Sequence, residues 1–256
     1  MTTVVDLHHR SDGPAGRPVL LLGGSLGTSL EMWDPQLSAL SAQCRVIRFD
    51  NRGHGASPVP DGPYSIAELG GDVLALMDRL EIERADYCGL SIGGMVGQWL
   101  AIHAAERIER LVVICSSPRT LNGDAFTQRA ATVREAGSVE VVADAVVARW
   151  FTEPFAAAHP DVVASHRAMV AGTPPEGYAS CCEAVAGHDV RGELNAVQAP
   201  TLVIGGAQDT AIAPEQGREI AAAVPGAAFE LLDPAAHLST VERAGAVTDL
   251  IIGHLT

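Results

Sequence analysis

Short apolar segments alternate with longer helical ones along most of this chain, and this alternation limits the fold more than any other feature. Several of the short segments are apolar at every position, as strands are when both faces of a parallel sheet are covered. The pattern predicts an α/β fold with a doubly wound, mostly parallel sheet. The predicted strands are residues 19–22, 45–50, 85–89, 111–115, 201–205 and 228–232, and the helices between them are residues 29–42, 66–80, 92–108, 214–224 and 238–254.

The alternation stops between about residues 118 and 199. This stretch shows helical periodicity at 126–136, 139–151, 160–171 and 178–185 and contains no convincing strand. We therefore expect a core made of residues 1–117 and 200–256, with a helical cap of residues 118–199 inserted after the strand that ends near Cys115. Such a cap would cover the carboxyl ends of the strands, where α/β folds bind ligands. Before Val19 only residues 4–9 resemble a strand, which predicts a short antiparallel edge.

Charge and composition exclude several classes of partner. With 17 basic against 31 acidic residues, the formal charge of −14 argues against a nucleic-acid or anionic-membrane surface. It also means that an anionic substrate would need positive charge placed locally. The start of the chain has no apolar signal core, and no apolar run approaches the length of a membrane span. Five cysteines without metal-ligand spacing favour a reduced, cytoplasmic protein.

The segment Gly89-Leu-Ser-Ile-Gly93 joins a strand-like run to a helix-like run. This context predicts a nucleophile elbow, in which Ser91 occupies a sharp, strained turn between strand and helix. Glycines two residues to either side leave room for such a turn. The N–H group of Ile92, at the start of the helix, would then point toward a developing oxyanion.

A serine nucleophile needs a histidine base and a carboxylate that orients it, and in this architecture the order is Ser, acid, His. Asp209 follows a late strand and His237 follows the last one, so we expect them to be the acid and the base. Asp233 is the rival carboxylate, but its place before a proline is typical of a turn. His54 lies in a tight turn, where a structural role is expected.

The loop after the first apolar strand, Gly23-Gly-Ser-Leu-Gly-Thr28, should supply the second oxyanion donor. Its small residues allow the backbone to approach a substrate carbonyl. We expect the donor to be the N–H of Leu26, with Ser25 as the alternative. The loop lacks the Gly-Lys-Ser/Thr ending of a phosphate-binding loop and the spacing of a dinucleotide fingerprint.

Taken together, these segments resemble the 3-oxoadipate enol-lactonases of the α/β-hydrolase superfamily. The likeness covers nearly the whole chain, although the elbow and the Asp50–Ser57 turn are common to many hydrolases. The Ser-Leu-Gly-Thr loop and two segments of the cap are more specific to this family. Gly24 departs from it, because members usually carry a polar residue there. The matching segments are residues 25–37, 48–57, 89–100, 149–152, 173–182 and 236–242.

The resemblance implies that Ser91 attacks a lactone carbonyl, that the ring opens to an enol, and that water hydrolyses the acyl-enzyme to 3-oxoadipate. It implies no metal and no organic cofactor. The partner would be a small carboxylated lactone, whose carboxylate needs a cation, and arginine is the best bidentate partner. Candidate substrate-binding residues on the cap are Arg129, Arg134, Arg149 and Trp150, and Arg119 would lie at the pocket entrance.

Other activities use the same three catalytic residues and differ only in the pocket. A general carboxylesterase, a cofactor-free perhydrolase and a carbon–carbon bond hydrolase are the enzyme alternatives. A hydrolase-fold receptor that senses a ligand is an alternative of another class, and it would turn its ligand over far more slowly than an enzyme. The sequence does not specify an oligomeric state.

Overall fold

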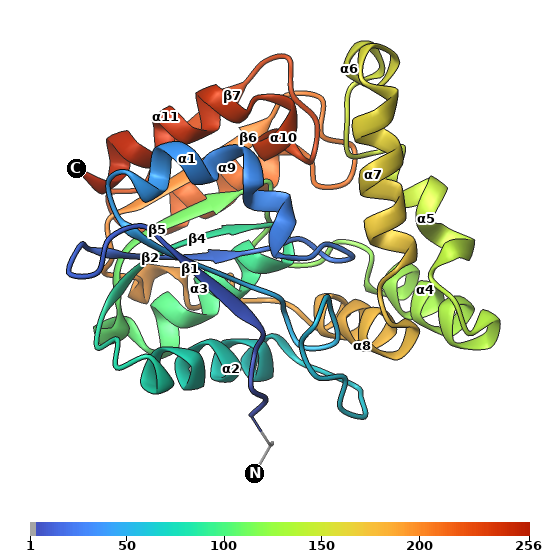
Figure 1. Cartoon of the computed structure of the whole chain (residues 1–256), viewed down its shortest axis with the longest axis horizontal. Coiled ribbons are helices and arrows are strands. Elements are labelled where there is room, and N and C mark those ends of the chain that lie inside the picture. The colour runs from blue at the N-terminus through green and yellow to red at the C-terminus, as the bar shows by residue number, and fades with distance from the viewer. Residues whose placement is uncertain (1–3) are drawn as a thin grey trace.

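A computed structural model describes residues 4–256 of the chain. Within this range seven strands form one sheet, ordered β1-β3-β2-β4-β5-β6-β7 (Figure 1). Only β1 runs antiparallel to its neighbour, so the predicted mostly parallel sheet is confirmed. The strands are β1 His9–Asp12, β2 Val19–Gly23, β3 Arg45–Phe49, β4 Ala85–Leu90, β5 Ile108–Ile114, β6 Thr201–Gly206 and β7 Ala228–Leu232.

The antiparallel edge strand lies at His9–Asp12, so its predicted position at residues 4–9 was wrong. The backbone of Val5 turns away from the sheet, because its N–H donates to Asp72 Oδ1 at 2.9 Å. Pairing begins where the His8 carbonyl accepts from the Asp50 N–H at 3.0 Å. The paired residues are polar because an edge strand has a solvent-exposed side, and their polarity hides them from a search for apolar runs.

Helices cover both faces of the sheet, with α1 packed beside α11 on one face and α2 beside α3 on the other (Figure 1). The Ser65 hydroxyl caps α2 by accepting from the Glu68 N–H at 3.2 Å. One predicted helix was too long, since α3 ends at His103, before β5, and the predicted C-terminal helix is divided in two at Arg243. The bounds are α1 Asp34–Ser41, α2 Ile66–Arg79, α3 Ile92–His103, α9 Pro214–Ala223, α10 Ser239–Glu242 and α11 Ala244–Leu255.

Five further helices lie between β5 and β6 in the sequence, and we call them the helical insert. They gather on one side of the molecule, beyond the ends of the strands (Figure 1). Four were predicted, whereas α6 was not; the Thr152 hydroxyl caps it by accepting from the Phe155 N–H at 3.4 Å. The helices are α4 Gly123–Ala136, α5 Glu140–Val147, α6 Glu153–Ala158, α7 Pro160–Ala171 and α8 Pro175–Ala186.

At one contact between the insert and the core, two glycines meet. A Cβ atom added to Gly53, in the turn after β3, would lie 2.4 Å from the Cα atom of Gly177 in α8. The two backbones therefore touch, and neither position has room for a side chain. Gly53 also has a φ angle of +75°, which other residues rarely adopt.

Candidate active site

Ser91 lies on a strained turn between β4 and α3. Its φ and ψ angles are 58° and −117°, a conformation that costs a residue with a Cβ atom free energy and is found mainly at functional sites. The turn needs glycine on both sides: a Cβ atom at Gly89 would lie 2.2 Å from the Gly93 carbonyl oxygen, and one at Gly93 would lie 2.3 Å from the Gly23 oxygen. The Ser116 hydroxyl donates to the Ser91 carbonyl at 2.8 Å. The local geometry is that of a nucleophile elbow.

Asp209 and His237 form a buried pair beyond the carboxyl ends of β6 and β7. His237 Nδ1 lies 2.8 Å from Asp209 Oδ2. The other oxygen, Asp209 Oδ1, accepts the backbone N–H groups of Ala211 at 2.8 Å and Ile212 at 2.9 Å. A carboxylate held in this way keeps the histidine proton on Nδ1, so Nε2 is free to accept a proton.

Two contacts fix the loop that carries His237. The Leu238 N–H donates to the Trp150 carbonyl oxygen, in the helical insert, at 2.8 Å. The Ala236 N–H donates to Glu242 Oε2 at 2.9 Å. Glu242 also accepts from the Thr152 hydroxyl, so the loop is tied both to the start of the C-terminal helical region and to the insert. Asp233, the rival carboxylate, is exposed.

The loop after β2 presents the backbone N–H of Leu26. Its neighbours are occupied: the Ser25 N–H donates to Met32 Sδ at 3.2 Å and the Gly27 N–H to His54 Nε2 at 2.9 Å. Within residues 4–256 the Leu26 N–H has no hydrogen-bond acceptor. Ile92 is the first residue of α3, so its N–H has no acceptor within the helix. These two groups, rather than Ser25, are available to an oxyanion.

One pocket of about 320 Å³ brings several of the predicted site residues together. Ser91 and His237 line it, and so do Ser25 and Leu26. The insert supplies most of the opposite wall, through α4, α8 and the end of α5. The lining from the insert and the segment before it includes Arg119, Phe126, Arg129, Val146, Arg149, Trp150, Tyr178 and Val185.

Positive charge concentrates at this pocket. Burial and then the nearby charge of Arg129 lower the pKa of the Arg149 guanidinium. Across the described chain, no carboxylate lies within ion-pair distance of Arg129 or Arg149. The Arg129 guanidinium lies 4.9 Å from the centre of the Phe126 ring and near Tyr178. Two like charges held close together in a partly buried wall favour an anionic ligand.

Arg134, also predicted to bind substrate, lies elsewhere. Its guanidinium contacts Glu176 Oε1 at 2.9 Å and Glu183 Oε1 at 2.6 Å, and it does not line the pocket. It joins α4 to α8 on the outer surface. Helical periodicity alone could not separate Arg129 from Arg134, because only the packing of α8 decides which face of α4 is covered.

Sequence reasoning missed two polar groups of the pocket wall, Tyr178 and Gln216, and placed a third, Arg119, at the pocket entrance. Tyr178 lines the pocket from α8, and burial raises the pKa of its hydroxyl. Arg119 Nε and Gln216 Oε1 are buried at the wall and, as far as residues 4–256 are concerned, have no hydrogen-bond partner. They remain available to a polar ligand. Gln216 comes from α9, and no sequence motif marks it.

Residues 4–256 contain no group of three or more His, Cys, Asp or Glu side chains placed to hold a metal ion. In the same range no helix combines the length and the apolar character needed to cross a membrane.

Comparison with known proteins places this chain in a family. The model of the α/β-hydrolase fold matches residues 17–244. The 3-oxoadipate enol-lactonase 2 of Acinetobacter baylyi is 42% identical, over 93% of this chain and 89% of its own length. The crystal structure of the enol-lactonase from Burkholderia xenovorans LB400 superposes with a TM-score of 0.95 at 45% identity, covering 98% of this chain and 96% of that one.

The chain belongs to the 3-oxoadipate enol-lactonase family of the α/β-hydrolase superfamily. It is therefore an enzyme of the carboxylic-ester hydrolase class. A crystal structure of a hydrolase from Pseudomonas aeruginosa PA01 is equally similar, with a TM-score of 0.95 and 45% identity over 98% of this chain and 94% of that one. Membership in the family confirms the expected fold.

Proposed function

We propose that this enzyme opens the ring of 3-oxoadipate enol-lactone to give 3-oxoadipate. The observation that carries the proposal is that the strained Ser91 and the Asp209-oriented His237 line one pocket with Arg129 and Arg149. A hydrolytic site beside unpaired cations suits an ester that carries a carboxylate. The Acinetobacter baylyi relative is a 3-oxoadipate enol-lactonase and the Burkholderia xenovorans relative is an enol-lactonase, which supports this substrate.

In the proposed mechanism, Ser91 Oγ attacks the lactone carbonyl while His237 Nε2 takes the hydroxyl proton. The carbonyl oxygen gains negative charge, and the N–H groups of Leu26 and Ile92 stabilise it. The ring C–O bond then breaks and the enol oxygen leaves. An enolate is a better leaving group than an alkoxide, so proton donation by His237 is less demanding than for an alkyl ester.

Hydrolysis of the acyl-enzyme completes the cycle. Water loses a proton to His237 Nε2 and attacks the acyl carbon, the bond to Ser91 Oγ breaks, and that oxygen recovers the proton. The released enol becomes the ketone in solution. The Asp209 carboxylate stabilises the positive imidazolium in both halves of the reaction, and the two backbone N–H groups on its second oxygen hold it in place.

The carboxylate of the substrate is proposed to bind Arg129 and Arg149, with Trp150 as an apolar wall. This placement leaves Arg134 outside the site. We also propose that residues 118–199 act as the cap of the pocket, on a core of residues 1–117 and 200–256. The prediction of a cytoplasmic enzyme stays part of this proposal, and the five buried thiols fit it.

A direct assay tests the substrate. The loss of enol-lactone absorbance should be followed beside the hydrolysis of a panel of neutral aryl and alkyl esters. We expect kcat/KM for the carboxylated lactone to exceed that of every neutral ester by about tenfold or more. An enzyme that hydrolyses neutral esters and leaves the lactone intact would instead be a general carboxylesterase.

A labelling experiment tests the nucleophile. A serine-directed fluorophosphonate should modify Ser91 alone, as read by mass spectrometry of the digested protein. Ser91→Ala should prevent labelling and reduce kcat by about 10⁴-fold or more with the fold intact. Labelling of another serine would overturn the assignment.

A further inference from the structure

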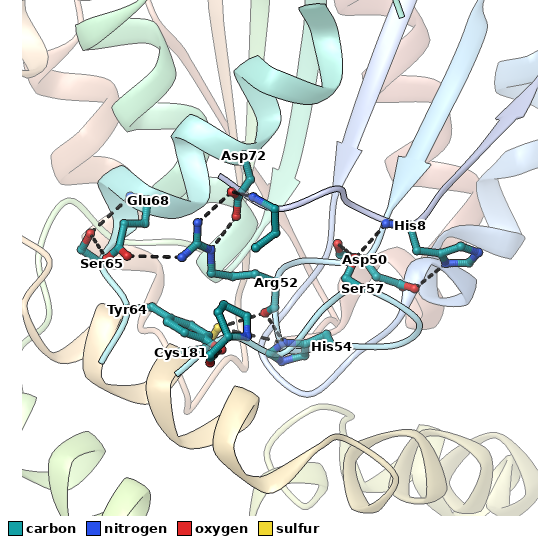
Figure 2. A network of polar contacts seen from close by, with 12 residues as sticks. His8, Asp50, Arg52, His54, Ser57, Tyr64, Ser65, Glu68, Asp72 and Cys181 are labelled. Atoms are coloured by element: carbon teal, nitrogen blue, oxygen red, sulfur yellow. Dashed lines mark hydrogen bonds and ion pairs between the residues drawn. The ribbon is translucent and has the colours of Figure 1, made fainter. Parts of the chain in front are cut away.

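His54 belongs to a buried polar network in which it contacts Arg52 of the same turn and lies next to Cys181 of α8, in the helical insert (Figure 2). Its side chain is fully buried. Nε2 accepts the Gly27 N–H at 2.9 Å, so that nitrogen carries no proton. The proton of the neutral ring is then on Nδ1, which lies 3.2 Å from the Arg52 carbonyl oxygen. Burial lowers the pKa of the imidazole, which favours the same neutral form.

The group that His54 binds belongs to the turn that presents the Leu26 N–H. The Thr28 N–H and hydroxyl both donate to the Ser25 carbonyl, at 3.2 and 2.8 Å, and close a four-residue turn. Gly27 is its third residue and has a φ angle of +81°. This combination is typical of a type II turn, which needs glycine at that position.

Type I and type II turns differ in the orientation of their central peptide, here the one between Leu26 and Gly27. Glycine can adopt both, so the residues of the turn do not choose between them. The hydrogen bond to His54 selects the type II form, because only in that form does the central peptide direct the Gly27 N–H toward Nε2. A flip of this peptide changes the ψ angle of Leu26, so Leu26, which lines the same pocket as Ser91, no longer has one fixed backbone conformation.

We propose that His54 is a positioning residue for catalysis, which holds the oxyanion donor Leu26 in place through the Gly27 peptide. The inference rests on the proposed role of the Leu26 N–H in ester hydrolysis. It does not depend on which ester is the substrate. His54 touches neither substrate nor Ser91, so its effect reaches the reaction through the turn.

The surroundings give His54 a rigid base. The Arg52 carbonyl oxygen accepts the hydrogen bond from Nδ1. The guanidinium of Arg52 is held in place because it donates to Asp72 Oδ2 at 2.6 Å, to Asp72 Oδ1 at 2.7 Å and to Glu68 Oε1 at 3.2 Å (Figure 2). On the other side, a Cβ atom at Gly27 would lie 3.2 Å from the Tyr178 ring of α8. The turn is therefore held between His54 and the insert.

Two substitutions distinguish the role of Nε2 from the role of Nδ1. In His54→Gln the side-chain oxygen can reach the place of Nε2 and accept the Gly27 N–H. In His54→Asn the shorter amide can reach the place of Nδ1 and donate to the Arg52 carbonyl, but it cannot reach Gly27. Both variants bury a neutral amide, so each serves as the control for the other.

The test uses 4-nitrophenyl acetate as substrate and phenylboronic acid as a tetrahedral mimic. For His54→Asn we expect kcat to fall by about 10- to 100-fold with KM changed less than about threefold, because loss of a whole oxyanion donor costs about 10²–10³. The affinity for phenylboronic acid should fall in parallel. His54→Gln should keep kcat within about fivefold of the wild type.

Equal loss of kcat in both variants, or full activity of His54→Asn, would overturn the inference. If His54→Asn does not fold, replacement of Gly27 by glycolic acid removes the same N–H without touching His54. That variant should lose about tenfold or more in kcat, and a loss below about twofold would overturn the inference too. The two variants could differ in kcat on 4-nitrophenyl acetate as expected while the wild-type enzyme leaves the lactone intact. That result would overturn the proposed substrate and support the role of His54.

Discussion

The Asp209 carboxylate contacts His237 with one oxygen and two backbone N–H groups with the other. In Asp209→Asn the amide oxygen can keep the backbone contacts, while the amide NH₂ faces Nδ1. The imidazole must then place its proton on Nε2, which cannot accept the Ser91 proton. We expect kcat to fall by about 10³–10⁴-fold with little change in KM, measured by steady-state ester hydrolysis.

Asp233→Asn is the matched control for this change, because Asp233 follows the last strand but is exposed. It should keep kcat within about twofold. A comparable loss in both variants would assign the orienting role to Asp233 or to the loop as a whole.

The two arginines of α4 differ in their surroundings, which gives a second prediction. Arg129→Ala should raise KM for the carboxylated lactone by about 10- to 100-fold, since a hydrogen bond to a charged group contributes about 1.5–3 kcal/mol. KM for a neutral ester should change by less than about threefold. Arg134→Ala should leave both KM values unchanged, because Arg134 binds Glu176 and Glu183 outside the pocket. Equal effects of Arg129→Ala on both substrates would remove it from the anion site.

His188 makes stability depend on pH. Burial lowers its pKa to about 4, and Nε2 lies 3.2 Å from the Ser117 carbonyl. The unfolded chain binds the proton near pH 6.5, so the stability contributed by the neutral ring is present above that pH and is lost as the pH falls toward 4. Between pH 7.5 and 4.5, the free energy of unfolding should fall by about 2–3 kcal/mol more for the wild type than for His188→Gln. Urea titrations at both pH values measure this difference, and parallel curves would contradict it.

The buried ion pair of Arg52 and Asp72 gives a prediction about stability. Arg52 is 3% exposed, and Asp72 is buried as well. Arg52→Met leaves the carboxylate without its main partner, so the free energy of unfolding should fall by about 3–5 kcal/mol. In Arg84→Met, which removes a half-exposed pair with Glu109, the loss should stay below about 1 kcal/mol. Thermal or urea unfolding compares the two, and similar losses would refute the distinction.

Most of the sheet could be predicted because its parallel strands are apolar throughout, as residues 19–22 and 111–115 illustrate. The edge strand could not, since its side chains are polar and its position is set by pairing with β3. The break at Arg243 escaped notice because apolar periodicity continues across it.

At the site, Ser91 is recognisable from five residues because its strained turn needs glycine at fixed positions. Asp209 and His237 follow from their order along the chain, and the hydrogen bond between them fits that expectation. The substrate-binding wall is harder to predict, because contacts between helices distant in sequence decide which side chains enter the pocket. Arg134 was predicted to bind the substrate but lies outside the pocket, whereas Gln216 lines the pocket and was not predicted.

The hydrogen bond from the Leu238 N–H to the Trp150 carbonyl joins the wall of the pocket to the loop that carries His237, the proposed base. Pocket shape and the proposed proton transfer by His237 are thus linked through one hydrogen bond. A new insert that widens the pocket near residue 150 also withdraws an anchor next to His237. If His237 is the base, we expect exchange of the insert for a bulkier substrate to lower the rate, whereas substitutions along α4 would change selectivity without moving the His237 loop.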